Sequence, residues 1–295
     1  MRARTVVPRR RTPPKSDEAV GALALADADR DPVPRRSDPA ARSFQDSMPE
    51  RYGASFDDEA IQEHAAIVAR RAGFFVHLEI WKRLSDGGVV LCVAADDRPG
   101  LLSFVSASLV VHDIDIVAVK AYTRTNPETG RAEAIDLLWV RRQTASALPV
   151  DQADVGRIGN VLAALIGGEA TVKSVLRTDR LCPPARAGAP TRVTFEGPAG
   201  EGPVVLTVET VDRPGLLLTI TQALYRASVQ IIASDAATRD GRVADRFTIV
   251  ERDGTPIGQA RRRAIQKEVM TAIESLAGAP SKRRSTRPPK ARGSP

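Results

Sequence analysis

One six-residue sequence occurs twice in the chain, and it constrains the fold more than any other feature. Asp97–Leu102, which reads Asp-Arg-Pro-Gly-Leu-Leu, returns 115 residues later as Asp212–Leu217. Each copy follows an apolar, β-branched run, Val89–Ala94 in the first case and Val204–Val208 in the second. Each copy also opens a segment with helical periodicity, so the pattern predicts a strand, a Pro-Gly turn and a helix. The internal repeat therefore predicts two copies of one structural unit.

The same order of elements is predicted in both copies: strand, strand, helix, strand, strand, helix. In the first repeat the segments are 74–80, 89–95, 101–112, 114–123, 132–141 and 155–165; in the second they are 192–196, 204–210, 216–224, 229–238, 242–251 and 265–276. Because no strand follows the final helix, a four-stranded sheet must take its fourth strand from upstream, at 74–80 and 192–196. The expected fold class is α+β, with two ferredoxin-like units. Each has a four-stranded antiparallel sheet with permuted strand order and two helices on one face.

Charge and composition divide the chain into six segments. The net charge is +7, but residues 1–15 and 280–295 each hold six basic groups and no acids, which leaves −5 for residues 16–279. Both ends are rich in proline and poor in apolar periodicity, which is typical of disordered tails. The predicted organisation is a disordered tail (1–47), an N-terminal helix (48–72), a first domain (73–180), a linker (181–190), a second domain (191–278) and a disordered basic tail (279–295).

Several classes of function are not expected from the residues present. No apolar run approaches the roughly 20 residues of a membrane helix, and no signal peptide precedes the first domain, so a cytoplasmic protein is expected. Cys92 and Cys182 have no His or Cys at metal spacing, and His64, His77 and His112 do not form a ligand set. Neither a P-loop nor Gly-x-Gly-x-x-Gly nor Gly-x-Ser-x-Gly is present. We therefore expect no cofactor, no metal and no catalytic residues.

The repeated turn is similar to a turn found in a known family of domains. An Asp-Arg-Pro-Gly-Leu turn between strand and helix resembles the ACT domain, a small amino-acid-sensing module. Residues 48–61 (MPERYGASFDDEAI), 87–117 (GGVVLCVAADDRPGLLSFVSASLVVHDIDIV) and 244–257 (ADRFTIVERDGTPI) are similar to the C-terminal part of the bacterial bifunctional PII uridylyltransferase/uridylyl-removing enzymes. That part carries two ACT domains in tandem. The resemblance covers roughly residues 48–277.

The resemblance implies ligand-binding residues at the two turns and at the start of the strand that follows each helix. These are Asp97, Pro99, Gly100, Leu101 and Asp115 in the first repeat, and Asp212, Pro214, Gly215, Leu216 and Gln230 in the second. Backbone N–H groups after Pro-Gly suit an α-carboxylate, and an Asp suits an α-ammonium group. Because the family often has an Asn at this strand start, the second repeat is expected to hold the more typical pocket. The alternative is that Asp97 and Asp212 only cap helices.

The expected function is a non-catalytic, amino-acid-sensing regulator of tandem ACT type in nitrogen or amino-acid metabolism, with glutamine as a candidate ligand. The uridylyltransferases carry nucleotidyltransferase and phosphohydrolase domains ahead of their ACT pair, and only 47 residues precede the match here. The candidate partners are a PII-type or other regulatory protein and a second copy of the chain; nucleic acid and membrane are not expected. Two alternatives stay open: a truncated or split uridylyltransferase whose catalytic domains act in trans, and a nucleic-acid-tethered regulator that uses the basic tails.

Overall fold

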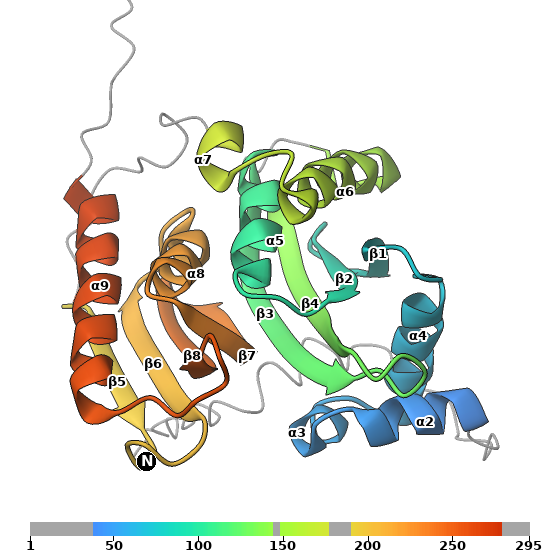
Figure 1. Cartoon of the computed structure of the whole chain (residues 1–295). Helices are drawn as coiled ribbons and strands as arrows, with labels where there is room; N and C mark the ends of the chain where they lie inside the picture. Colours follow the sequence, from blue (N-terminus) through green and yellow to red (C-terminus); the bar gives the residue numbers. More distant parts are fainter. Residues whose placement is uncertain (1–37, 144–147, 177–189, 279–295) are drawn as a thin grey trace, which may run out of the picture.

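The computed structural model describes residues 38–143, 148–176 and 190–278 of the chain (Figure 1). Residues 1–37 of the predicted N-terminal tail, the predicted linker up to residue 189 with Cys182, and the predicted C-terminal tail lie outside the described residues. No helix among the described residues is long and apolar enough to cross a membrane.

Helix α2 (Pro39–Ser47) occupies residues that the sequence analysis assigned to a disordered tail ending at residue 47. The Asp38 carboxylate accepts the Ala40 N–H at 3.0 Å, a proline starts the helix, and Ala41 and Phe44 are buried. A capped helix with a buried face therefore begins earlier than predicted. The segment 48–72, predicted to hold the N-terminal helix, contains that helix as α4 (Asp58–Ala69), preceded by the short α3 (Glu50–Gly53).

Both repeats contain the predicted elements in the predicted order. The first repeat consists of β1 (Val76–Arg83), β2 (Val89–Asp96), α5 (Leu101–Val110), β3 (Ile114–Thr125), β4 (Ala132–Arg142), α6 (Gln152–Gly167) and the short α7 (Val172–Val175). The second consists of β5 (Arg192–Glu196), β6 (Val204–Val211), α8 (Leu216–Arg226), β7 (Val229–Arg239), β8 (Arg242–Glu251) and α9 (Gln259–Gly278). The upstream strands β1 and β5 pair with β2 and β6, as the absence of a strand after each last helix requires.

The strands form one continuous antiparallel sheet, not the two separate sheets that the sequence predicted. Its order is β1-β2-β4-β3-β7-β8-β6-β5, so the two repeats meet edge to edge at β3 and β7. The pairing at this junction runs from Ala118 opposite Ala237 to Tyr122 opposite Ala233. When two four-stranded sheets join in this way, the backbone N–H and C=O groups of the two joined edge strands become hydrogen-bonded to each other and are no longer exposed. The junction places the second turn of the chain beside the first repeat, and the first turn beside the second repeat.

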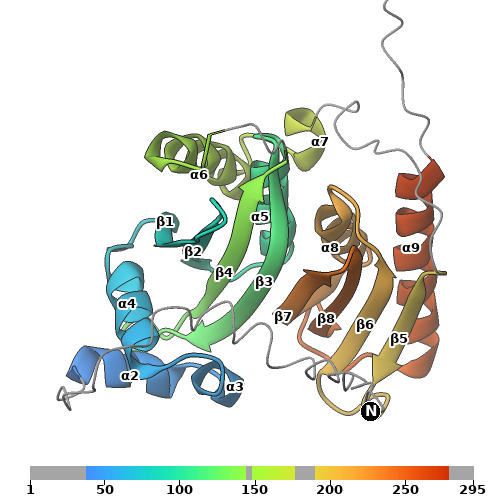
Figure 2. The same ribbon diagram turned by 180° about the vertical axis from the view of Figure 1, so that it is seen from behind.

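Helices α5, α6, α8 and α9 cover one face of the sheet, whereas α2, α3 and α4 lie beside the first repeat (Figures 1 and 2). The strands reflect this difference. Every residue of β2 from Val89 to Ala95 is buried, while β6 alternates between buried and half-buried residues. A strand covered on both faces requires a continuous apolar run, and a strand covered on one face alternates. The apolar run in β2 therefore indicates that the sheet of the first repeat is covered on both faces. The alternating Val204–Val211 sequence indicates that the sheet of the second repeat is covered on one face.

Candidate functional site

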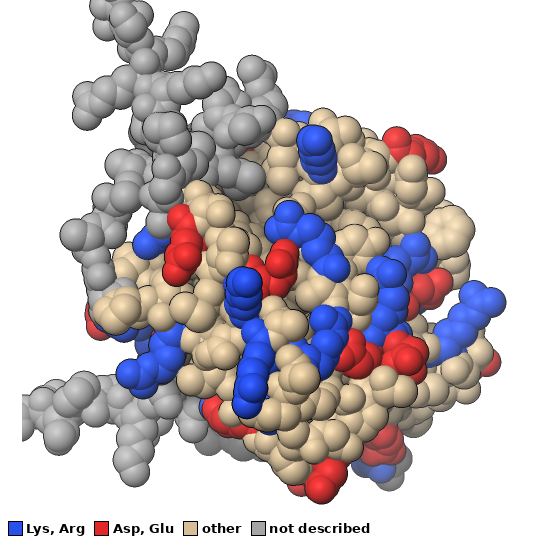
Figure 3. Space-filling model, turned by 60° about the vertical axis from the view of Figure 1, so that its left-hand side comes forward, with Lys and Arg blue, Asp and Glu red and all other residues tan. Residues whose placement is uncertain are grey.

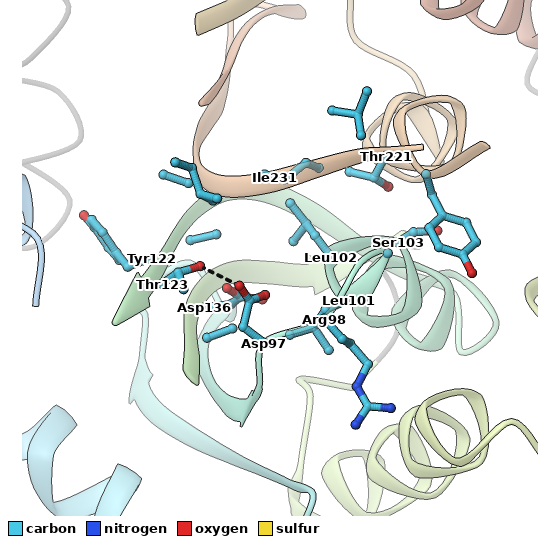
Figure 4. Close-up of a pocket in the computed structure, with 17 residues that line it drawn as sticks. Asp97, Arg98, Leu101, Leu102, Ser103, Tyr122, Thr123, Asp136, Thr221 and Ile231 are labelled. Carbon is cyan, nitrogen blue, oxygen red and sulfur yellow. Dashed lines mark hydrogen bonds between the residues drawn. The ribbon is translucent and has the colours of Figure 1, made fainter. Parts of the chain in front are cut away.

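The first turn lies in a pocket that both repeats build, which we call the Asp97 pocket (Figure 4). Its lining from the first repeat is Asp97, Arg98, Gly100–Ser103, Ala121–Thr123, Ala134 and Asp136; its lining from the second is Thr221, Tyr225, Val229 and Ile231–Ala233. The turn between β2 and α5 thus faces α8 and the start of β7. The Asp97 and Asp136 carboxylates lie next to each other in this pocket, whereas Arg98 points away from them (Figure 4).

The second turn lies in an equivalent pocket, which we call the Asp212 pocket. Its lining from the second repeat is Asp212, Arg213, Gly215–Leu218, Ala236–Thr238, Val243 and Asp245; its lining from the first is Val110 and Asp115–Val119. The contributions of the two repeats are exchanged relative to the Asp97 pocket. This exchange follows directly from the antiparallel β3–β7 junction, which relates the two repeats by an approximate twofold rotation.

Both turns have the same backbone conformation. Gly100 and Gly215 are the N-cap residues of α5 and α8, with φ values of 84° and 78° that favour glycine. No side chain caps either helix, whereas Asp57 and Asp151 cap α4 and α6. Asp97 and Asp212 therefore do not cap the helices that follow them, which excludes the capping alternative. The Leu101 and Leu216 N–H groups donate to the Arg98 and Arg213 carbonyls, and among the described residues no side chain accepts from the next two N–H groups of either helix, an arrangement that suits an anion.

The residue at the start of β3 or β7 lies beside the turn of the other repeat, not beside the turn of its own repeat. The Gln230 amide donates to both carboxylate oxygens of Asp97 at 3.2 Å, although the sequence analysis grouped Gln230 with Asp212. Asp115 lies in the Asp212 pocket, although it was grouped with Asp97. Burial and then the nearby Asp212 charge raise the pKa of Asp115 to about 6. The amide that we expected beside Asp212 therefore contacts Asp97, and that grouping by repeat was wrong.

The remaining predicted residues support the turns. Leu101 and Leu216 are buried in the core under the first turn of each helix. Pro99 and Pro214 precede the N-cap glycines and are half-buried. These residues set the position of the backbone N–H groups and do not offer side-chain donors or acceptors of their own.

Two buried carboxyl groups that the sequence analysis did not single out face the pockets. Asp136 on β4 and Asp245 on β8 are each 3% exposed and line the Asp97 and Asp212 pockets. Burial and then Asp97 raise the pKa of Asp136 to about 8, and burial and then Asp212 raise the pKa of Asp245 to about 8. The signal that could have found them is an acid with an apolar residue two positions before it and two positions after it in both repeats (AIDLL and VADRF).

The Asp97 pocket is closed over its turn by a side chain of the other repeat. A Cβ added to Gly100 would lie 2.7 Å from Cδ2 of Tyr225, so the tyrosine ring packs directly on the turn. Phe104 packs edge-on against the same ring, with centroids 6.0 Å apart. Each pocket encloses about 30 Å³, which has room for roughly two water molecules. An amino acid therefore enters only if the covering side chains move.

Replacing Gly100 with alanine is expected to destabilise the protein more than a comparable change elsewhere. The left-handed backbone costs an L residue about 1–2 kcal/mol, and the added Cβ clashes with the Tyr225 ring, which adds about 1–3 kcal/mol. Gly87 is the matched control, since it has a φ of 83° and nothing within 4 Å of an added Cβ. Urea unfolding of both variants measures the difference. Equal effects at the two positions would show that Tyr225 does not pack on the turn.

His64 packs among the buried aromatic side chains beside α4, whereas the partly exposed His77 pairs with Glu79. The His64 ring lies 2.7 Å from the Tyr52 hydroxyl, and burial lowers the pKa of His64 to about 3. Within residues 38–143, 148–176 and 190–278, no group of three or more His, Cys, Asp or Glu residues could hold a metal ion.

The sequence of the chain is similar to those of several known proteins. No protein-family model matches the chain. The chain is 25% identical over 263 residues to the bifunctional uridylyltransferase/uridylyl-removing enzyme of Phenylobacterium zucineum (strain HLK1), covering 88% of this chain and 27% of that enzyme. Enzymes of the same name from Ruegeria pomeroyi and Rhodospirillum rubrum are 27% and 26% identical, over 62% and 75% of this chain and 20% and 24% of theirs.

Among solved structures, aspartate kinase from Synechocystis has a TM-score of 0.35 and 14% identity, covering 65% of this chain and 27% of that chain. That likeness is too low to define the fold. The chain spans about a quarter of the length of the curated relatives named above. It is therefore a two-repeat protein that resembles bifunctional uridylyltransferase/uridylyl-removing enzymes over most of its own length.

Proposed function

We propose that the chain is a cytoplasmic, non-catalytic regulatory protein of tandem ACT type that senses an amino acid in nitrogen metabolism, with glutamine as the first candidate. The observation that carries this proposal is the construction of the two pockets. In each, the uncapped N-terminus of a helix lies beside carboxylates contributed by the turn and a strand. The helix N–H groups suit an α-carboxylate and the Asp side chains suit an α-ammonium group.

Signalling follows from the shared lining. Each pocket takes residues from both repeats, and Tyr225 of α8 covers the turn of the first repeat. Because each pocket has room for only about two water molecules, occupancy by an amino acid requires a shift of the lining side chains or of the junction between the repeats. The ligand then stabilises the opened packing by its differential affinity for the two states. A partner that contacts both repeats, either a PII-type protein or a second copy of the chain, would detect this shift.

A thermal-shift screen of the twenty amino acids on the whole chain tests the proposal. A ligand at 100 times its dissociation constant adds about 2.7 kcal/mol to the free energy of unfolding, and each kcal/mol raises Tm by about 2–4 °C. We expect a rise for at least one amino acid, and its loss in Asp97→Ala or Asp212→Ala. Glu196→Ala is the control, since Glu196 forms an exposed ion pair with Arg246. A flat response across the panel would contradict amino-acid sensing.

The similarity to the uridylyltransferases supports one alternative, in which this chain is the regulatory part of a split enzyme. In that case it would alter uridylyl transfer to a PII-type protein when mixed with a separate nucleotidyltransferase chain. A transfer rate that does not change on mixing, with or without glutamine, would contradict the alternative.

The basic tails that suggested nucleic-acid binding lie outside the described residues. On the face shown in Figure 3, acidic side chains lie among the basic ones, so this face has no continuous positive stripe of the kind that follows a phosphate backbone. We therefore do not propose a nucleic-acid partner.

A further inference from the structure

The two buried carboxyl groups, Asp136 and Asp245, occupy equivalent places but differ in their contacts. Asp136 shares its sheet face with Ala134, Leu138 and Val140, which belong to the core under α5 and α6. Among the described residues, no hydrogen bond or ion pair reaches the Asp136 carboxyl, and only burial and the Asp97 charge act on it. The Asp245 carboxyl, in contrast, lies close enough to the Ala237 backbone for that backbone to oppose the rise in its pKa that burial causes.

A buried polar group without a partner is rare in proteins, because it loses its hydration and gains nothing in return. Asp136 could be replaced by an apolar residue at no structural loss that the described contacts reveal, since it binds nothing in the core. The side chain instead lines the pocket beside Asp97 (Figure 4). Its position is therefore better explained by a group that enters the pocket than by the fold.

The charged and titratable groups around Asp136 indicate what kind of ligand group suits the pocket. The turn contributes Asp97 and Arg98, and Nη1 of Arg98 donates to the Ile166 carbonyl at 2.9 Å and not to either carboxylate. Strand β3 contributes Tyr122 and helix α8 contributes Tyr225; the lining residues from β7 do not titrate. Two adjacent carboxyl groups thus face a cavity into which no Lys or Arg of the described residues is directed; Asp97 accepts hydrogen bonds from the uncharged Thr123 and Gln230 side chains. A ligand ammonium group supplies that charge, which rests on the amino-acid class given under Proposed function.

We propose that Asp136, together with Asp97, binds the ammonium group of the ligand in the Asp97 pocket and releases a proton to solvent as the ligand enters. In the empty pocket the Asp136 carboxyl holds this proton, because burial and the neighbouring Asp97 raise its pKa to about 8. When R–NH₃⁺ enters, the O–H bond of Asp136 breaks, the proton leaves to water, and the carboxylate accepts hydrogen bonds from the ammonium group. Asp136 is then a specificity-determining residue for primary amines.

Calorimetric titration of the whole chain tests this, with each of the twenty amino acids as probes and with glutaramic acid, which is glutamine without its α-amino group. Titrations at pH 7 in phosphate and in Tris, which differ in heat of ionisation, measure the protons released. Wild type is expected to release close to one proton per bound amino acid. Its affinity should rise by about tenfold per pH unit between pH 6 and 7.5. Asp136→Asn should release none and bind at least tenfold more weakly, and glutaramic acid should not bind wild type.

Glu196→Gln is the control, because Glu196 is exposed, pairs with Arg246 and lines neither pocket; its affinity and proton release should stay as in wild type. Circular dichroism and Tm show whether each variant is folded, and Asp97→Asn provides a second variant with the same expected loss. Amino-acid binding with no proton release and with unchanged affinity in Asp136→Asn would overturn this inference and leave the proposed function standing. Failure of every amino acid to bind would overturn both.

Discussion

Replacing Glu133 with alanine is expected to destabilise the protein by about 3–5 kcal/mol, because it leaves the buried Arg124 guanidinium without its counter-charge and leaves Arg71 with Asp96 as its one acidic partner among the described residues. Glu133 is 2% exposed, and Arg71 and Arg124 are each 8% exposed. Its Oε1 lies 2.6 Å from Nη1 of Arg71 and its Oε2 lies 2.7 Å from Nε of Arg124. Arg71 follows α4, and Arg124 donates to Ser47 at the end of α2, so this one carboxylate joins the N-terminal helices to β4.

Chemical denaturation measures this loss, and the exposed pair of Glu196 and Arg246 provides the control. Those side chains are 51% and 53% exposed and lie 2.9 Å apart, so Glu196→Ala should cost less than about 1 kcal/mol. A loss below about 1 kcal/mol for Glu133→Ala would contradict the counter-charge role of this carboxylate and leave the apolar contacts and the Arg70–Glu79 and Arg71–Asp96 pairs to hold the N-terminal helices to the sheet.

Asp136→Asn is expected to remove part of the pH dependence of stability. A carboxyl group whose pKa is raised to about 8 in the folded state still ionises near 4 in the unfolded state. The stability that it contributes is fully present below pH 4 and is lost as pH rises toward 8, because the unfolded chain releases its proton first. Wild type should therefore lose stability between pH 5 and pH 8, and the Asn variant should lose less over the same range.

Asp154→Asn gives the opposite sign and serves as the control. Although burial opposes it, hydrogen bonds from the Asp151 backbone, Arg142 and Arg157 hold the pKa of Asp154 below its usual range. Its contribution to the free energy of unfolding is present at neutral pH and is lost as pH falls through that lowered pKa. Asp154→Asn should therefore lower the free energy of unfolding more at pH 7 than at acid pH. Urea unfolding at several pH values measures both slopes. An Asp136→Asn variant with the slope of wild type would show that Asp136 is ionised in the folded protein.

The sequence predicted what depends on local pattern. The turns at Gly100 and Gly215, the helices that follow them and the upstream strands β1 and β5 are all short-range features, and each was found in the structure. The start of α2 was missed because the segment that precedes it, residues 27–38, is rich in Arg, Asp and Pro, and the core contacts of Phe44 in α2 appear only in the structure.

The sequence did not predict the pairing between β3 and β7, whose residues lie more than a hundred positions apart in the chain. The junction of Ala118–Tyr122 with Ala233–Ala237 has no local signal, since small and apolar residues suit many strands equally. That pairing decides that Gln230 meets Asp97 and that Asp115 meets Asp212, so the site residues were named individually but grouped wrongly. Asp136 was missed because a single acid in a strand usually faces solvent, whereas both faces of β4 are covered here.

The central claim, that each pocket joins a turn of one repeat to a strand start of the other and takes an amino acid, is tested most directly by one set of titrations. The amino acid that binds wild type is titrated into Asp97→Ala, Gln230→Ala and Asp212→Ala, and into the two double variants that contain Gln230→Ala. The account predicts that Gln230 and Asp97 are coupled, so their double variant loses less affinity than the sum of the single losses, and that Gln230 and Asp212 are additive within about 0.5 kcal/mol. Coupling of Gln230 to Asp212 in place of Asp97, or no binding by wild type, would contradict it.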